Sequence, residues 1–148
     1  MLTIEQYGVK LTRLQIEEIE LVRNWRNQDF VAQNMDYQKH ITQKEQKKWF
    51  ESINNANNYY FIIHFNNEKI GVINAKNYDE QKGFGEGGIF IGKKEYLETV
   101  APTFSTLCLL NVVFLEMKLT QISRVKVLNK NHKSIEYNKL LGYKLLEN

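Results

Sequence analysis

One glutamate lies in an unusually glycine-rich part of the sequence, Gly85-Glu86-Gly87-Gly88-Ile89. A carboxylate accepts a proton directly or through a water, which makes Glu86 a candidate general base. Glycines leave open space beside a strand and permit a bulge, which favours a ligand running next to this carboxylate. The alternative is a strand glutamate that only faces solvent, the commoner situation for a single residue of this type.

A second candidate site is the start of a helix that the sequence predicts from about Pro102 to Met117. The free backbone amides and the dipole of a helix N-terminus favour a phosphate group. Pro102 has no amide hydrogen but is acceptable in a first turn. The loop before it contains no glycine, so an ordinary junction between loop and helix is an equal alternative. The amides that remain there as donors belong to Val100, Ala101, Thr103 and Phe104.

Composition excludes several other kinds of site. Cys108 is the only cysteine and lies in an apolar run, which rules out an internal disulfide or a cysteine-based metal cluster. No metal-ligand cluster and no nucleophile-elbow motif is present, and we expect no metal. The net charge is +3, with basic and acidic residues mixed along the chain, so we expect no nucleic-acid partner. His40 and His64 have no identifiable catalytic partner.

The chain of 148 residues is long enough to bury its own core, and we expect a single domain over residues 1–148. Hydrophobic residues make up 43% and charged residues 25%, as in soluble globular proteins. The longest apolar stretch, near Leu107 to Phe114, is much shorter than the roughly 20 residues that span a membrane. Because the N-terminus has no apolar secretory segment, we expect a cytoplasmic protein without a membrane partner.

The elements that would position these residues begin with a strand, since Tyr7 to Leu14 alternates apolar and polar positions. Apolar residues at helical spacing predict a helix from Ile16 to Trp25. Thr42-Gln43-Lys44-Glu45 is a capping box that starts a second helix. An antiparallel meander follows, with a tight turn at Asn66-Asn67. Its strands are predicted at Tyr59–Phe65, Lys69–Ile73 and Gly85–Ile91.

The remaining elements complete an α/β arrangement around one mixed sheet. After the helix near Pro102, an alternating run predicts a strand from Ile122 to Leu128. Asn131 is placed to cap a short helix that ends at Gly142. A last strand is predicted from Tyr143 to Leu146.

This element order, with Asn131-His132-Lys133-Ser134 leading to Lys139-Leu140-Leu141-Gly142-Tyr143, resembles the GNAT acetyltransferase superfamily. The front half is similar to the amino-sugar N-acetyltransferases of flagellin pseudaminic acid biosynthesis. This similarity rests on Leu21-Val22-Arg23-Asn24-Trp25-Arg26-Asn27, Ile41-Thr42, Trp49-Phe50-Glu51 and Tyr60-Phe61-Ile62-Ile63. The ribosomal-protein N-terminal acetyltransferases share part of the pattern. The resemblance implies a GNAT fold, with a central mixed, mostly antiparallel sheet flanked by helices.

The resemblance also implies acetyl-CoA as acyl donor and a catalytic role for Glu86 as the acidic residue of the reaction centre. Family enzymes often carry a tyrosine acid on the last helix, and counting back from Gly142 puts Asn138 at that position. Tyr137 is one residue away, rotated by roughly 100° around the helix, and is expected in the core. The residues expected to contact the cofactor are Ile89, Ile91, Val100, Ala101, Thr103, Phe104, Asn131 and Ser134.

The same branch builds its acceptor pocket near the end of the first helix. The substrate-binding candidates are Trp25, Arg26, Asn27, Met35, Tyr37 and Trp49. Trp25 lies on the apolar helical face, where core packing is the stronger interpretation, and Arg26 is equally suited to a surface salt bridge or to an acceptor phosphate. The acceptor implied is the primary amine of a nucleotide-linked amino sugar.

Two alternatives to this acceptor remain. One is a peptide or protein amine, and the other is a non-catalytic binding module with the same fold. The family's last strand has no counterpart in the sequence, which raises the expectation of a shortened form or of a homodimer whose partner chain fills the gap.

Overall fold

The computed structural model describes residues 3–79, 84–111, 122–125 and 127–144. Within these residues the strands form one six-stranded sheet in the order of the chain. Neighbouring strands from β1 to β5 are antiparallel, whereas β6 runs parallel to β5. The strands are β1 (Thr3–Gln6), β2 (Val9–Arg13), β3 (Tyr59–Phe65), β4 (Glu68–Asp79), β5 (Phe84–Ile91) and β6 (Ile122–Val125).

The N-terminal segment is a hairpin, which corrects the single strand predicted from Tyr7 to Leu14. The chain reverses at Tyr7 and Gly8, whose φ angles are 58° and 77°. Two consecutive positive φ angles match the twist of antiparallel strands, and glycine adopts one of them without strain. The predicted turn at Asn66-Asn67 is confirmed, with φ angles of 52° and 62°.

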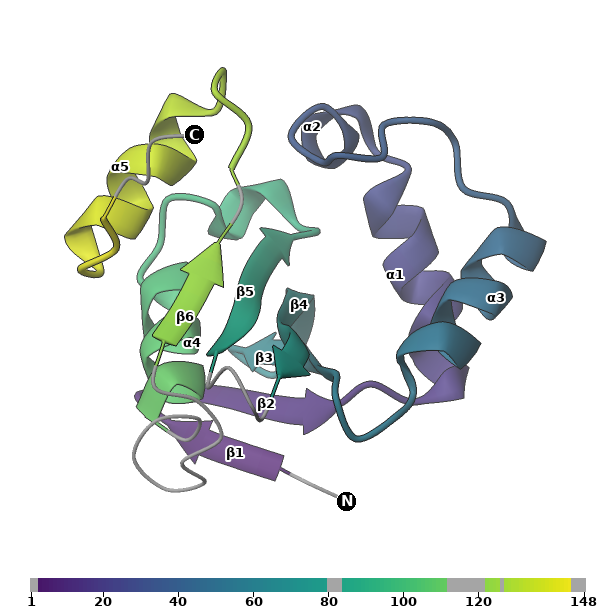
Figure 1. Cartoon of the computed structure of the whole chain (residues 1–148), viewed down its shortest axis with the longest axis horizontal. Helices are drawn as coiled ribbons and strands as arrows, with labels where there is room; N and C mark the ends of the chain where they lie inside the picture. The colour runs from purple at the N-terminus through teal and green to yellow at the C-terminus, as the bar shows by residue number, and fades with distance from the viewer. Residues whose placement is uncertain (1–2, 80–83, 112–121, 126, 145–148) are drawn as a thin grey trace.

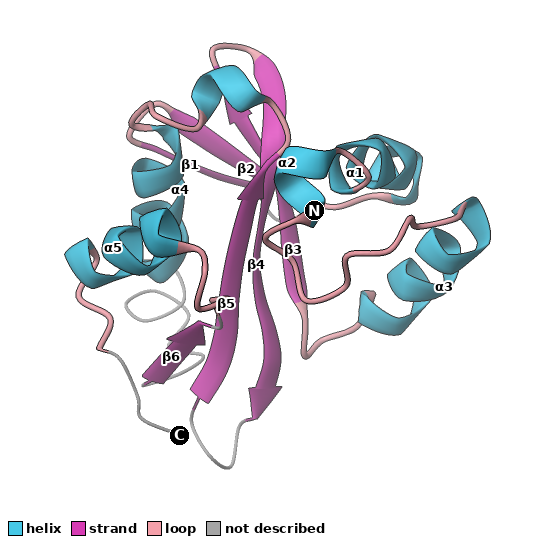
Figure 2. Cartoon of the chain, turned by 90° about the horizontal axis from the view of Figure 1, so that it is seen from above, coloured by secondary structure: helices cyan, strands magenta, loops and turns pink. Residues whose placement is uncertain are grey.

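Helices cover both faces of the sheet, as Figures 1 and 2 show. One face carries the short 3-10 helix η1 (Ile16–Glu18), α1 (Ile19–Arg26) and α3 (Gln43–Ile53), with α2 (Asp29–Ala32) beside the end of α1. The other face carries α4 (Ala101–Leu110), with α5 (His132–Leu140) beside it; the 3-10 helix η2 (Lys94–Tyr96) precedes α4. No helix of the described ranges is long and apolar enough to cross a membrane.

Helix starts follow the predicted caps. Thr42 Oγ1 accepts a hydrogen bond from the Glu45 amide at 3.2 Å, which confirms Thr42 as the N-cap of α3. Asn131 Oδ1 accepts from the Ser134 amide at 3.3 Å at the start of α5. Both caps use a local side chain to satisfy an amide that has no partner inside its helix.

Alternation along β3 divides the hydrophobic core between the two faces. Phe61 and Ile63 pack with α4, while Tyr60 and Ile62 pack with α1 and α3. Successive strand side chains point to opposite faces, so a strand covered on both sides reads as a continuous apolar run. This central strand therefore holds the two helical layers at fixed positions relative to the sheet.

The parallel pairing between β5 and β6 is short. It runs from Phe84 opposite Ile122 to Gly87 opposite Val125, whereas Gly88 to Ile91 pair only with β4 among the described residues. The strand predicted from Ile122 to Leu128 thus ends at Val125, and residues 127–128 are not in a strand. Figure 1 shows β5 and β6 separating beyond this paired stretch.

The C-terminal elements agree with the sequence where the structure describes them. Helix α4 ends at Leu110, and the predicted continuation to Met117 lies outside the described residues. Gly142 follows α5 with a φ of 96°, as its predicted role in ending this helix requires. Tyr143 and Lys144 are not in a strand, and the rest of the predicted last strand lies outside the described residues. A mixed, mostly antiparallel sheet between helices confirms the expected fold class.

Candidate active site

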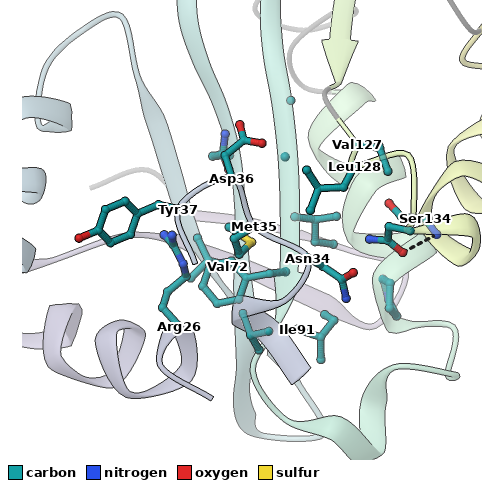
Figure 3. A pocket seen from close by; sticks show the side chains of 18 of the residues that line it. Arg26, Asn34, Met35, Asp36, Tyr37, Val72, Ile91, Val127, Leu128 and Ser134 are labelled. Carbon is teal, nitrogen blue, oxygen red and sulfur yellow. Dashed lines mark hydrogen bonds between the residues drawn. The ribbon is translucent and has the colours of Figure 1, made fainter. Parts of the chain in front are cut away.

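A cavity of about 710 Å³ opens where β5 and β6 diverge. It is lined by α1, the segment after α2, α3 and β4 on one side, and by the segment before α4, residues 127–131 and α5 on the other. Figure 3 shows Arg26 and Tyr37 on one side of the strands and Ser134 on the other, with Met35 between them. This volume lies within the range of ligand pockets, about 300 to 1,000 Å³.

Four of the predicted acceptor residues line this cavity, namely Arg26, Met35, Tyr37 and Trp49. The Tyr37 hydroxyl donates to Glu45 Oε2 at 2.8 Å, which links the segment after α2 to α3. The Trp49 ring meets the Tyr60 ring edge-on, with centroids 5.2 Å apart. Side chains from four separate segments therefore converge on one wall.

The structure does not bring Trp25 and Asn27 to the cavity lining. Trp25 is 6% exposed and belongs to the core between α1 and the sheet. The Asn27 side chain accepts from the Ile41 amide at 2.8 Å and donates to the Ile41 carbonyl at 3.0 Å. Its carboxamide is used to hold the segment that carries Met35 and Tyr37.

Arg26 projects into the cavity from the end of α1 (Figure 3). Its guanidinium carbon lies 5.8 Å from the centroid of the Phe90 ring. Burial lowers the pKa of Arg26, and its buried Nε has no hydrogen-bond partner among the described residues. An arginine keeps its charge in such surroundings, so this side chain favours an anionic ligand.

Glu86 lies on the same face of the sheet as this arginine. It pairs with Lys76 in the register of β4 and β5, and it alternates with Gly88 and Phe90, the latter packed against the core under α1. Glu86 lines the cavity and is half-buried.

Tyr60 connects these two charged groups electrostatically. Burial raises the pKa of Tyr60 to about 12; nearby Arg26 lowers it, and nearby Glu86 raises it further. Its phenol therefore stays protonated at neutral pH. The three side chains all line the cavity and interact electrostatically there.

Gly88 has a packing reason for being glycine. In the sheet register Asn74 lies between Tyr60 on β3 and Gly88 on β5. A Cβ on Gly88 would lie 3.0 Å from Asn74 Oδ1, which is tighter than ordinary contact. The Asn74 carboxamide thus covers the β5 backbone at this point, next to Glu86.

On the far side of the cavity, Ser134 is the centre of a small network (Figure 3). Asn131 caps its amide, and Asn138 Nδ2 donates to the Ser134 carbonyl at 2.8 Å and to its Oγ at 3.3 Å. All three predicted residues line the cavity. The predicted cofactor residues Ile89 and Ile91 also line it, from β5.

Tyr137, expected in the core, is half-buried and contacts α4 through its hydroxyl. The hydroxyl donates to the Pro102 carbonyl at 2.7 Å and lies 2.5 Å from Thr106 Oγ1. Burial raises the pKa of Tyr137 to about 12. Its ring nevertheless forms part of the cavity wall.

The first turn of α4 differs from the expected phosphate site. None of the four predicted donors, Val100, Ala101, Thr103 and Phe104, belongs to the cavity lining, whereas Leu97, Glu98 and Pro102 do. Ala101 is fully buried, and its amide donates to Thr99 Oγ1 at 3.3 Å. The Phe104 ring packs against the Tyr7 ring with centroids 5.7 Å apart. The Ala101 amide and the Phe104 ring therefore contact other residues of this chain, although the sequence predicted that these two residues bind a ligand.

Sequence reasoning missed several lining residues, among them Phe30, Tyr60, Asn74, Glu98 and Lys133. Alternation along β3 and β4 assigns Tyr60 and Asn74 to one face of the sheet, but it does not say that this face borders a cavity. No group of three or more His, Cys, Asp or Glu side chains arranged to hold a metal occurs in the part of the chain that the structure describes.

Solved acetyltransferases share this fold. The ribosomal L7/L12 alpha-N-protein acetyltransferase RimL in complex with coenzyme A aligns with a TM-score of 0.85 at 14% identity, over 99% of this chain and 86% of that chain. Spermidine N-acetyltransferase from Vibrio cholerae, in complex with CoA and spermine, gives 0.80 at 14% identity, over 96% and 82%.

The microcin C7 self-immunity acetyltransferase MccE, in complex with acetyl-CoA and AMP, gives a TM-score of 0.79 at 15% identity, over 96% of this chain and 82% of that chain. At these identities the likeness shows a common fold. A comparison with curated proteins gave no match. The sequence model of the acetyltransferase (GNAT) domain matches residues 9–144, and with nearly the whole chain inside that match, the protein belongs to the GNAT acetyltransferase family.

Proposed function

We propose that this protein transfers an acetyl group from acetyl-CoA to the primary amine of a nucleotide-linked amino sugar. The observation that carries this proposal is that Glu86 and Arg26 line one continuous cavity, which extends to Asn131 and Ser134. One end of the cavity thus offers a base beside an anion-binding group, and the other offers polar contacts for an acyl donor.

The anionic part of the acceptor is the role proposed for Arg26. Its guanidinium forms no ion pair with any described residue, and a half-buried cation without a partner favours a ligand phosphate. A polyamine has the opposite charge and would be repelled by this group. Among the solved relatives, the complex with acetyl-CoA and AMP is an example of a nucleotide bound by this fold.

The residues on the other side fit an acyl donor with a pantetheine arm. The residues of β5 from Gly88 to Ile91 line the cavity, and among the described residues they pair only with β4. In this proposal their backbone groups on the β6 side bind the amides of such an arm. Asn131 and Ser134 face the same space from α5. This combination of a strand edge and a polar helix start supports the donor site.

Acetyl-CoA would supply an acetyl group activated as a thioester. For this chemistry Glu86 accepts a proton from the acceptor amine, directly or through a water, so that the nitrogen lone pair is free to attack. Tyr60 stays protonated, so its neutral hydroxyl remains a hydrogen-bond donor near this carboxylate. Binding both reactants in one cavity supplies the proximity on which acyl transfer depends.

The proton for the leaving thiolate comes from water in this proposal. Asn138 is hydrogen-bonded to Ser134, and an amide is not an acid in this pH range. Tyr137 has a raised pKa and donates to the Pro102 carbonyl, so it is a poor acid as well. Asn138 therefore acts by orienting the start of α5.

The test is an acetyl-transfer assay with purified protein, acetyl-CoA and a panel of UDP-linked amino sugars, unlinked amino sugars, peptide amines and spermine. We expect the nucleotide-linked sugars to give the highest kcat/KM. The variant Arg26→Gln should raise KM for them about tenfold or more, since a charge-assisted contact is lost, and leave the unlinked sugars unchanged.

Two outcomes would contradict the proposal. A preference for peptide amines would mean that the acceptor is a peptide or protein amine, as the name of the solved ribosomal L7/L12 alpha-N-protein acetyltransferase states for that enzyme. Absence of any heat of acetyl-CoA binding in calorimetry at millimolar donor would leave a non-catalytic binding module with this fold.

A further inference from the structure

An ion pair joins the segment before α4 to the start of α5 on the donor side of the cavity. Lys133 Nζ lies 2.9 Å from Glu98 Oε1. Glu98 lies on the segment just before α4, and Lys133 is the second residue of α5. Both residues line the cavity, so the contact lies on its wall, between the starts of the two helices.

This ion pair is easily broken when another anion binds Lys133. The two side chains are 89% and 81% exposed, and an ion pair in such surroundings contributes little to stability because water solvates both charges. Its electrostatic effect is still evident, since Lys133 lowers the pKa of Glu98. A ligand with more negative charge than one carboxylate would bind Lys133 in place of Glu98.

The first turn of α4 provides few donors for such a ligand. Pro102 has no amide hydrogen, and the Ala101 amide is already bonded to Thr99. The described lining residues contributed by the segment before α4, by α4, by residues 127–131 and by α5 include one cation, Lys133. Among these described residues, a diphosphate entering here therefore meets one positive charge, that of Lys133, which is paired with Glu98.

We infer that Lys133 is the phosphate-binding cation of the donor site and that Glu98 competes with the diphosphate for it. Binding of the acyl donor breaks the ion pair, and release of the product restores it. The inference rests on the proposed use of acetyl-CoA. It makes Glu98 an internal competitor that weakens donor binding and speeds product release.

The experiment measures the dissociation constant of CoA by calorimetry for the wild type, Lys133→Ala and Glu98→Gln, with pantetheine as a probe that lacks the phosphates. We expect Lys133→Ala to weaken CoA binding about tenfold, as the loss of one charge-assisted phosphate contact implies. Glu98→Gln should tighten it about threefold, the scale of an exposed ion pair. Neither change should alter pantetheine binding.

The matched control is Lys139→Ala, which removes a lysine of the same helix whose Nζ lies 3.6 Å from Glu136 Oε1 and which does not line the cavity. It should leave CoA binding unchanged. The salt dependence of CoA binding should be weaker in Lys133→Ala than in the wild type and in Lys139→Ala, because one cation no longer contacts phosphate.

The possible failures are distinct. If the wild type binds CoA but Lys133→Ala binds it equally well, or loses pantetheine to the same degree, this inference is wrong and the proposed function stands. If Glu98→Gln weakens CoA binding, the inference that Glu98 competes with the diphosphate for Lys133 is wrong. If the wild type binds no CoA, the proposed function and this inference both fall.

Discussion

The ring of Trp25 occupies the space in which a side chain on Gly92 would begin. A Cβ built on Gly92 would lie 2.2 Å from Trp25 Cγ, far inside van der Waals contact. Gln28 Nε2 also donates to the Gly92 carbonyl at 2.9 Å. The end of α1 is thus packed directly onto the chain after β5, and this contact positions Arg26, the residue after Trp25, at the cavity wall.

Substituting Gly92 tests this packing. We expect Gly92→Ala to lower the free energy of unfolding by about 2 to 3 kcal/mol, because a methyl group forced into a closed core displaces the indole ring. Urea unfolding measures the change. Gly8→Ala is the control, since no atom lies within 4 Å of its Cβ and its cost of about 1 kcal/mol comes only from a φ of 77°. Equal losses in the two variants would refute the packing.

The double hydrogen bond between Asn27 and Ile41 leads to a second prediction. Asn27→Ala removes both bonds and leaves the Ile41 amide without its acceptor, so we expect a loss of about 2 kcal/mol in unfolding free energy. The segment with Met35 and Tyr37 loses its anchor, so KM for the acceptor should rise while CoA affinity is retained. Asn24→Ala, at an exposed position of the same helix, should change neither quantity. An Asn27→Ala enzyme with unchanged acceptor KM would show that this segment does not shape the acceptor site.

Glu86 provides the catalytic prediction. Glu86→Gln keeps the size of the side chain but removes its ability to accept a proton, so we expect kcat to fall about 100-fold or more. The dissociation constant of CoA should stay the same, because the carboxylate lies on the acceptor side of β5. Glu51→Gln, at an exposed position of α3, is the control and should leave kcat unchanged. Unaltered turnover in Glu86→Gln would remove this residue from the mechanism.

Alkaline stability tests the burial of Tyr60 and Tyr137. Both have a pKa near 12 in the folded protein, raised by burial from an unfolded value of 10.0. The folded state therefore holds these protons more tightly. This stabilisation is fully present below about pH 10 and is lost as the pH rises toward 12.

We expect the unfolding free energy of the wild type to decline over this pH range, and Tyr137→Phe to decline less steeply from a lower starting value. The lower start reflects the lost hydrogen bonds to Thr106 and the Pro102 carbonyl. Urea titrations at several pH values measure both quantities. Parallel declines in the two proteins would mean that Tyr137 ionises as readily in the folded state as in the unfolded state.

Local signals in the sequence predicted much of the fold. The caps Thr42 and Asn131 act within three residues of chain, and both helices begin where these residues predict. Strand β3 has its predicted bounds because its aromatic and β-branched run is bordered by polar residues on both sides. The hairpin at Tyr7-Gly8 was missed because one glycine inside an alternating run does not reveal a reversal of the chain.

The candidate site depended on contacts between distant segments. Arg26 and Trp25 are neighbours in sequence, yet only their packing against Phe90 and Gly92 decided that one lines the cavity and the other fills the core. The placement of Tyr60 beside Arg26 and Glu86 depended on the register of β3, β4 and β5, which no single segment encodes.

By itself, then, the sequence determined most of the segments that form helices and strands, the glycine-rich surroundings of Glu86 and the resemblance to the GNAT family, because these are properties of short runs of residues. Only the tertiary structure decided where β5 and β6 diverge, which side chains face the resulting cavity and that Glu98 meets Lys133 at its wall. The physical reason is that a cavity forms where strand pairing stops. That point is fixed by packing among residues far apart in the chain.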